Sequence, residues 1–447
     1  MSSILIHGGL IVNEGRSYNG YIIVRNGVIE TVAEGAFEGP FDGERIDASG
    51  CWVLPGAIDD QVHFREPGLT YKADIASESA AAVAGGVTSF MDMPNVKPPT
   101  VTLDLLEQKF ETAARTSSAN YSFYLGATND NGKEVARVDP RHVCGVKVFM
   151  GSSTGNMLVD DTHALAAIFD TSPVVVATHC EDEARIRARM AEFRNRYGDD
   201  APASIHPLIR DAEACYISTA RAVELADRYQ AQLNVLHLST ARELSLFESG
   251  PVEGKAITAE VCVHHLWFSD RDYAAYGNRI KWNPAIKSIE DRDALRQGIV
   301  DDKVDIVATD HAPHTLEEKS QPYWSAPSGG PSIQHSLPAM LTLAAQGFWS
   351  KEKVVEKMCH GPALRYGVVG RGFLRSGYHA DIVIVDPQRP QTVSRDNLLY
   401  KCGWSPFEGC RLACSVVLTL VNGRKVFENG RVDPDIRGER LEFSPRR

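Results

Sequence analysis

The sequence predicts an α/β protein, a TIM-like (β/α)8 barrel that carries a small β-sandwich built from both termini. Three observations predict this fold. Short apolar runs alternate with helical stretches across residues 59–368, as in a barrel domain. Several of these runs end in histidine, lysine or aspartate, where a barrel has its active site. Strand-rich segments, residues 1–58 and 369–447, flank the barrel and are expected to meet as the two parts of the sandwich, the second part including a tail.

The alternating region contains eight candidate strands, each separated from the next by helical or loop segments. They cover residues 58–63, 87–93, 121–127, 144–150, 174–179, 233–238, 256–262 and 305–309. Helices are expected at residues 75–84, 103–114, 162–169, 182–197, 213–229, 241–247 and 292–300. A doubly wound open sheet is the alternative, but it concentrates its ligand at one switch point. Polar residues at so many strand ends therefore favour the barrel.

The two flanking segments show the composition of short strands joined by tight turns. Candidate strands near the N-terminus are rich in β-branched residues, and Gly and Asn-Gly turns separate them. Near the C-terminus, the run 416–421 is followed by Asn422-Gly423 and then by 425–428, which is the pattern of a β-hairpin.

Composition limits the classes of partner and the compartment. The chain of 447 residues has 47 basic and 58 acidic side chains, a net charge of −11, which argues against broad binding to nucleic acid or anionic membranes. It has no apolar run near the ~20 residues of a membrane span, and the pattern of a signal peptide is missing. Its nine cysteines show no Cys-x-x-Cys pair, so we expect reduced thiols and a cytoplasmic protein.

The strand ends carry residues that bind divalent transition metals: His63, Lys147, His179, His237 and Asp310. A single histidine at a strand end is more often a hydrogen-bonded structural residue than a ligand. Five such groups in the same topological place, however, are what a metal centre at a barrel mouth needs.

Lys147 is unusual because it lies inside the apolar strand Gly145–Met150. One interpretation is a structural lysine paired with a barrel carboxylate. The other is a lysine whose pKa is lowered by burial, so that its neutral amine reacts with carbon dioxide. The resulting carbamate has two oxygens that can bridge two metals. The residues alone leave these two interpretations open.

Other polar residues near the strand ends also have two interpretations. Arg65 can hold a substrate carboxylate, or it can be an ordinary salt-bridged arginine. Asn95 can donate to the same carboxylate, or it can be a turn residue after Pro94. The pair His264-His265 can orient a ligand or simply pack in the core. Residues 316–328 suggest a mobile loop over the site.

Taken together, several motifs resemble the dihydroorotases of the amidohydrolase superfamily, nearly from end to end. The motifs are His63-Phe-Arg-Glu-Pro-Gly68, Gly85-Gly-Val-Thr-Ser89, Met93-Pro-Asn95, Lys147, Ala177-Thr-His179, His237-Leu-Ser239 and Ala308-Thr-Asp-His-Ala-Pro-His314. Later segments, Gly329–Pro338, His360–Ala363 and Gly377–Val383, also resemble family segments.

The resemblance implies one or two zinc ions and a carboxylated Lys147 that bridges them. In this family pattern His63 and Asp310 bind the more buried metal, and His179 and His237 bind the other. Asp310 is also the catalytic acid and base for a hydroxide that attacks the ring amide. The implied reaction is the reversible cyclisation of N-carbamoyl-L-aspartate to (S)-dihydroorotate and water, a step of pyrimidine (UMP) biosynthesis.

For the substrate, the resemblance implies that Arg65, Asn95 and His314 hold the free carboxylate and that Asn283 contacts the ring. It also suggests a homodimer and an association with aspartate carbamoyltransferase.

One residue departs from the family pattern, and it keeps alternatives open. The family usually begins the barrel with His-x-His, but here the first of these positions is Gln61, a poor zinc ligand. One alternative is a related cyclic amidohydrolase, such as an allantoinase or a dihydropyrimidinase, whose substrates do not need Arg65 with Asn95. Another is a non-catalytic scaffold for aspartate carbamoyltransferase, against which the retained Lys147 and Asp310 count.

Overall fold

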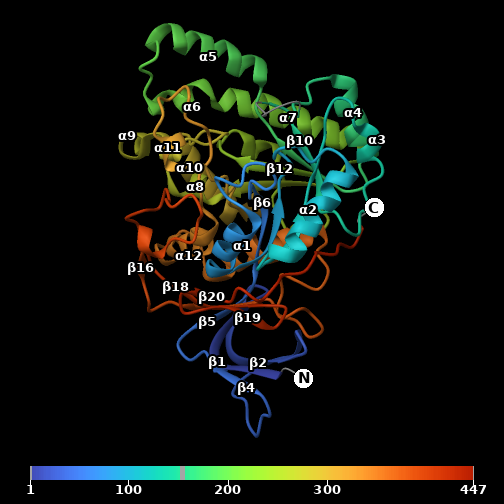
Figure 1. Ribbon diagram of the computed structural model, residues 1–447, viewed down its shortest axis with the longest axis vertical. Helices are drawn as coiled ribbons and strands as arrows, with labels where there is room; N and C mark the ends of the chain where they lie inside the picture. The colour runs from blue at the N-terminus through green and yellow to red at the C-terminus, as the bar shows by residue number, and fades with distance from the viewer. Residues whose placement is uncertain (1–2, 152–156, 446–447) are drawn as a thin grey trace.

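A closed barrel of parallel strands forms the centre of the molecule (Figure 1). The computed structural model describes residues 3–151 and 157–445, so residues 1–2, 152–156 and 446–447 of the predicted ranges lie outside the described chain. The barrel strands are β6 (Ala57–Val62), β7 (Val87–Asp92), β8 (Asn120–Phe123), β9 (Leu125–Gly126), β10 (Gly145–Phe149), β11 (Val175–His179), β12 (Leu233–Leu238), β13 (Ile257–Cys262) and β14 (Ile306–Ala308).

These strands form a three-stranded and a six-stranded parallel sheet. Only Tyr124 separates β8 from β9, so the two occupy a single strand position and the barrel has eight positions. The barrel closes because Val62 forms a parallel bridge with His311, and the His63 amide donates to the His311 carbonyl at 2.7 Å. The predicted (β/α)8 architecture is confirmed, and every candidate strand lies within a few residues of an observed one.

Helices cover the outside of the barrel and begin where the sequence supplies a capping side chain. The principal ones are α1 (Ile75–Ala84), α2 (Leu103–Thr116), α4 (Thr162–Thr171), α5 (Glu183–Tyr197), α7 (Ala212–Tyr229) and α10 (Ile289–Val300). Their N-caps, Asp74, Thr102, Asp161, Asp182, Asp211 and Ser288, each accept a backbone N–H of the first turn. The helix expected at residues 241–247 is instead the short 3-10 turn η2 (Glu243–Leu246).

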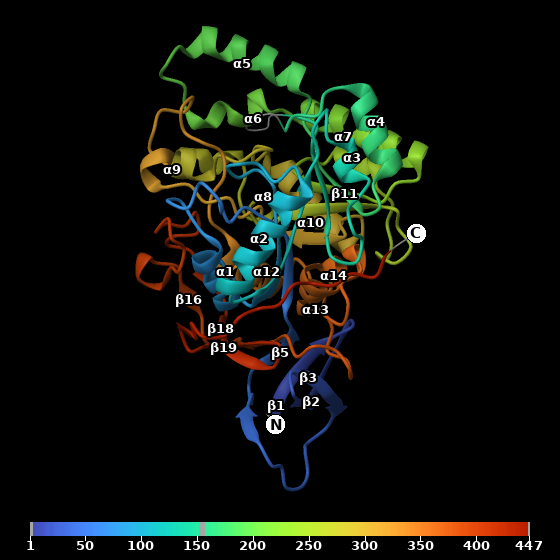
Figure 2. The same cartoon turned by 45° about the vertical axis from the view of Figure 1, so that its right-hand side comes forward.

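One pair of helices projects from the barrel at the end where the carboxyl termini of the barrel strands lie (Figures 1 and 2). The pair consists of α5 and the short helix α6 (His206–Ile209). These helices pack around a small apolar core that is separate from the core of the barrel. In this core Ile186 and Phe193 of α5 pack with Tyr323 from the segment that follows β14. Among the helices that the structure describes, none has both the length and the apolarity to span a membrane.

Strands from both ends of the chain share one sheet beneath the barrel (Figure 1). Its order is β20-β19-β18-β15-β5-β1-β2-β3, with β4 paired to β1. The members are β1 (Ser3–Asn13), β2 (Arg16–Arg25), β3 (Val28–Glu34), β4 (Glu44–Asp47), β5 (Trp52–Pro55), β15 (Ile382–Asp386), β18 (Ser415–Val421), β19 (Arg424–Glu428) and β20 (Arg431–Val432). The two halves join where β5 pairs antiparallel with β15, as the strand-rich ends predicted.

The predicted hairpin turn between β18 and β19 is present. Asn422 and Gly423 have φ of 51° and 71°, the left-handed pair that a tight two-residue hairpin requires.

A buried ion pair fastens this sheet to the barrel. Asp381, only 3% exposed, accepts hydrogen bonds from the Arg371 guanidinium at 2.5 Å and from the Asn422 amide at 2.8 Å. The Asn120 side chain, on the barrel strand β8, donates to the same carboxylate at 3.1 Å. One carboxylate therefore links three segments that are distant in the sequence.

We predict that Asp381→Ala lowers the free energy of unfolding by about 3 kcal/mol, because the buried Arg371 charge loses its buried partner and keeps only the exposed Glu439 at 3.3 Å. Urea unfolding followed by circular dichroism measures the change. Glu34→Ala is the control, since it breaks the exposed pair with Arg16 and should change stability by less than about 1 kcal/mol. Equal effects of the two substitutions would contradict the role of the buried pair.

Candidate active site

The structure brings all nine predicted site residues to one cavity of about 490 Å³ at the carboxyl ends of the barrel strands. They are His63, Arg65, Asn95, Lys147, His179, His237, Asn283, Asp310 and His314. The cavity wall also contains residues that the sequence analysis did not assign to substrate or metal, among them Gln61 and Lys72. The site is thus assembled from loops and strand ends of nearly the whole barrel, as this fold allows.

Three of these residues hold a strained backbone. Arg65, His237 and Asp310 have φ of 68°, 43° and 44°, in the left-handed region that residues other than glycine seldom adopt. All three are buried. Such strain persists where the surrounding structure fixes the chain, and it is concentrated at functional sites.

His179 and His237 face each other across the cavity floor. The Nδ1 atom of His179 lies 3.0 Å from Nε2 of His237, and burial lowers the pKa of both imidazoles. On its other side, His179 donates its Nε2 proton to the Glu181 carboxylate at 3.0 Å, and Arg210 forms a close ion pair with the same carboxylate. Although burial raises the pKa of Glu181, Arg210 and His179 bring it down to about 2, so Glu181 is an anion.

These contacts fix the tautomer of His179. With its proton on Nε2, its Nδ1 lone pair points at His237, whose own Nδ1 is buried without a hydrogen-bond partner. Two neutral imidazoles whose nitrogens converge at 3.0 Å fit a divalent metal between them. The sequence analysis did not find Glu181 and Arg210, although a carboxylate two residues after a candidate ligand was a usable signal.

Lys147 lies in the same cavity, with 1% of its surface exposed. Its amine sits over the Phe149 ring at 4.7 Å and forms no ion pair with another described residue. Burial lowers the pKa of the amine to about 8, so about a tenth of it is neutral at pH 7, far more than for an exposed lysine. The paired structural lysine that was one interpretation of the sequence is therefore not what the described residues form.

His63 and Asp310 form the opposite side of the cavity. The Nε2 atom of His63 lies 3.0 Å from Oδ1 of Asp310, and its Nδ1 lies 2.8 Å from the Asn95 side-chain oxygen. The Gln61 amide donates to the same Asp310 oxygen at 3.3 Å. This side therefore offers one imidazole and one carboxylate, and an amide N–H occupies the position where the family pattern has a second imidazole.

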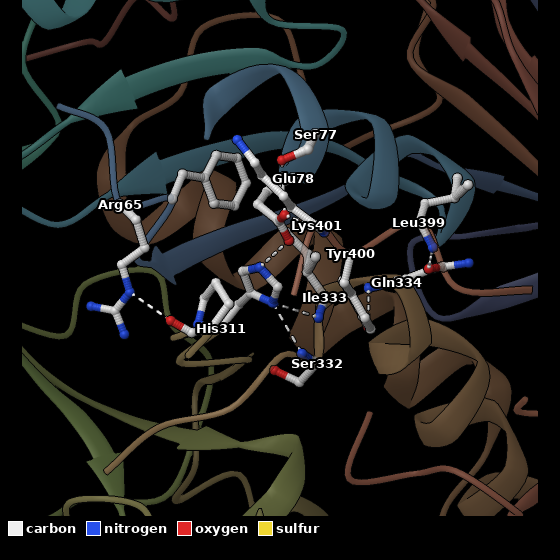
Figure 3. Close-up of polar contacts among 12 residues, drawn as sticks. Arg65, Ser77, Glu78, His311, Ser332, Ile333, Gln334, Leu399, Tyr400 and Lys401 are labelled. Atoms are coloured by element: carbon white, nitrogen blue, oxygen red, sulfur yellow. Dashed lines mark hydrogen bonds and ion pairs between the residues drawn. The ribbon is translucent and has the colours of Figure 1, made fainter. Parts of the chain in front are cut away.

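The residue after Asp310 anchors the strand end. Figure 3 shows the His311 ring between Glu78 of α1 and the backbone of Ser332 and Ile333. Its Nδ1 accepts the two backbone N–H groups at 3.0 and 3.3 Å, so Nε2 carries the proton that it donates to Glu78 at 2.8 Å. His311 and Glu78 are fully buried, which fixes the place of Asp310 beside them.

A group of cationic side chains forms the outer part of the cavity. Arg65 donates to the Pro313 carbonyl at 3.0 Å and lies 3.1 Å from Nε2 of His314. The Lys72 amine donates to Nδ1 of His314 at 2.9 Å and pairs with Glu318, also at 2.9 Å. Burial lowers the pKa of His314 well below its usual range, so the imidazole is neutral. The cavity mouth therefore suits an anion.

Lys72 was missed because a lysine in a loop has the sequence appearance of a surface residue, yet it is only 8% exposed.

The segment 316–328, expected to be mobile, packs against the barrel. It begins with the short helix α11 (Leu316–Lys319), and the Lys319 amine donates to the carbonyls of Lys281, Pro327 and Gly329 at 3.2, 2.9 and 2.7 Å. Close to it, the side-chain oxygen of Asn283 lies 3.2 Å from Nε2 of His206. Several contacts thus hold this wall of the cavity in place.

A second group of possible metal ligands lies behind the cavity wall. Among the described residues, Cys262, His264 and His265 are the only three His, Cys, Asp or Glu side chains whose ligand atoms lie within 4.8 Å of one another. None of them lines the cavity. The His264 ring stacks on Trp282, and His265 Nε2 donates to the Pro284 carbonyl at 3.1 Å, so both histidines pack as part of the core.

Comparisons with known proteins agree with this geometry. The model of the amidohydrolase family matches residues 52–426. Similar curated proteins include the dihydroorotase of Halobacterium salinarum, 35% identical over 88% of this chain and 93% of its own length, and that of Pyrococcus furiosus, 33% identical over 98% and 96%. Among solved structures, the L-hydantoinase (dihydropyrimidinase) of Arthrobacter aurescens superimposes with a TM-score of 0.90 at 27% identity, covering 97% of this chain and 98% of its own.

We predict that Glu181→Gln weakens the affinity of this site for a divalent metal, tested with zinc, by about 10- to 100-fold, because the neutral amide no longer fixes the His179 tautomer as the carboxylate does. Competition with a coloured chelator measures the affinity. The control is Glu183→Gln, two residues along the chain, where the carboxylate pairs with the exposed Arg187 instead. If both variants bind zinc as the wild type does, Glu181 has no part in orienting His179.

Proposed function

Because this chain belongs to the amidohydrolase family, we propose that it is a dihydroorotase, which interconverts N-carbamoyl-L-aspartate and dihydroorotate. The observation that carries the proposal is that one cavity contains both a set of possible metal ligands and a cationic group. Converging imidazoles and a buried lysine lie at its floor, and the Arg65 guanidinium lies at its mouth. A ring amide that bears a free carboxylate needs both features. Relatives named dihydroorotase, similar over most of the chain, support this substrate class.

The residues on one side of the cavity fit a zinc ion, which His179, His237 and a carboxylated Lys147 would hold. The family pattern has a second ion, which would fall to His63 and Asp310. When bound, zinc supplies Lewis acidity and lowers the pKa of a coordinated water.

Asp310 has the position of the proton carrier. Its Oδ1 atom is engaged by His63 and Gln61, and its left-handed backbone directs the carboxylate into the cavity. In ring opening the carboxylate accepts the proton of the attacking water and returns it to the leaving ring nitrogen. In the cyclisation direction the same group takes the proton from the ureido nitrogen.

The cationic mouth binds and orients the substrate. Arg65 matches a carboxylate in a two-pronged manner. The neutral His314 donates its Nε2 proton to the Ser328 carbonyl at 3.0 Å and accepts from Lys72 at Nδ1, so it holds both cationic side chains beside the carboxylate. Lys72 adds a second positive charge beside them. Asn95 and Asn283, both on the cavity wall, provide the remaining polar contacts. Together these groups hold the carboxylate so that the ring amide faces the cavity floor.

The hydantoinase-type alternative rests on the structural similarity to the Arthrobacter enzyme. Hydantoins and dihydrouracil lack the ring carboxylate, so they give the buried Arg65 no partner. The scaffold alternative is disfavoured because a non-catalytic barrel gains nothing from a buried, unpaired lysine beside two uncharged histidines.

The test of the proposal is the ring opening of dihydroorotate with added zinc, followed by its ultraviolet absorbance. We expect turnover by the wild type and only background turnover by Lys147→Ala, because no other described side chain supplies the same buried amine to the cavity floor. Lys357→Met is the control, since this lysine is equally buried but pairs with Asp302 away from the cavity. A wild type that opens hydantoin or dihydrouracil and not dihydroorotate would refute the assignment.

We predict that Arg65→Gln lowers kcat/KM for dihydroorotate by on the order of 100-fold or more, because a buried charged partner of the carboxylate is lost. The turnover of dihydrouracil, which has no carboxylate, should change far less. Measuring both substrates with the same preparation separates carboxylate binding from damage to the fold. An equal loss for both substrates would show that Arg65 acts on the structure of the site.

A further inference from the structure

We propose that the cavity binds a single divalent cation, held by Lys147, His179 and His237. The side-chain amide of Gln61 occupies the position of a second cation. This inference deepens the proposed function and rests on it. It concerns the one position at which the sequence departs from the family pattern, and the geometry of Gln61 carries it.

The orientation of the Gln61 amide is determined at both ends. Its nitrogen donates to Oδ1 of Asp310 at 3.3 Å, and its oxygen accepts from the Cys262 thiol at 3.6 Å. The reverse orientation would set the amide oxygen against the Asp310 carboxylate. Gln61 is 1% exposed, so water does not relieve such a repulsion. The group that faces Asp310 is therefore an N–H donor.

A metal ligand must present a lone pair, and an amide N–H has none. The remaining groups on this side supply only two ligand atoms. His63 gives its Nδ1 proton to the Asn95 oxygen at 2.8 Å, so its Nε2 lone pair faces Asp310 Oδ1 at 3.0 Å. A cation here would find one imidazole and one carboxylate, and it would have to displace the Gln61 N–H that the Asp310 oxygen already accepts.

The opposite side has no such donor in the contacts of its two imidazoles with described residues. Glu181 keeps the His179 proton away from the cavity, and Nδ1 of His179 converges with Nε2 of His237 at 3.0 Å in the cavity that Lys147 also lines. One cation there replaces only the proton that the two rings share. The two sides therefore differ at Gln61: one offers two imidazoles, and the other offers one imidazole and a carboxylate that already accepts an amide N–H.

The test is the zinc content of the protein after chelation, reloading with excess zinc and desalting, measured by plasma mass spectrometry. We expect one ion per chain for the wild type and a twofold increase for Gln61→His, which restores an imidazole. Loading with manganese gives an independent signal: the spectrum of an isolated ion in the wild type and a spin-coupled pair in Gln61→His, by electron paramagnetic resonance.

Two further variants locate the ion. His179→Ala should lose the single zinc, whereas His63→Ala should retain it, and the unfolding midpoint of each variant controls for folding. Gln61→Leu, which removes the donor without adding a ligand, should stay at one ion. Two ions in the wild type, or loss of zinc in His63→Ala but not in His179→Ala, would overturn the inference. None of these measurements uses substrate, so failure of the proposed function, no turnover of dihydroorotate, is distinguished from failure of the single-cation inference.

Discussion

The buried pair of His311 and Glu78 is the interaction on which the site depends. It joins α1 to the end of β14, and the His311 ring also receives the backbone of Ser332 and Ile333 (Figure 3). Glu78 in turn accepts the Lys401 amide at 3.0 Å, so the C-terminal segment is fastened to the same point. Losing one partner of such a buried hydrogen bond leaves the other unsatisfied, which is destabilising. What the pair provides is a fixed location for the neighbouring Asp310.

The same constraint explains where the backbone is strained. Asp310 and His237 lie at the ends of barrel strands, and both turn into left-handed conformations there. The surrounding contacts hold these residues in place: His311 is bound on three sides, and the His237 amide donates to the buried Glu260 at 3.2 Å. The barrel thus supplies rigid walls, and the strain directs side chains into the cavity.

Much of the fold could be predicted because periodicity is local. Apolar runs and capping residues specify the strands and helices of the barrel, and Asn422-Gly423 specifies the β18–β19 hairpin of the sheet beneath it. The 3-10 turn at 243–246 replaced a predicted helix because a seven-residue apolar pattern is too short to decide between them. In the site, the residues that follow the barrel strands could be predicted, because the ends of parallel strands meet at one mouth of the barrel. Glu181 could have been found from its place two residues after His179, but Lys72 and Arg210 could not, because contacts between distant loops leave no periodic signal.

The pairing of β5 with β15 has a consequence for synthesis of the chain on the ribosome. Val53 lies opposite Ile384, so the edge of β5 has no partner in this sheet until almost the entire barrel has been made. At a synthesis rate of roughly 5–20 residues per second, the interval is on the order of 20 s to one minute. During that time the first strands expose an unpaired edge rich in apolar residues, which is a site for mispairing between nascent chains. The last strands to emerge therefore protect the first.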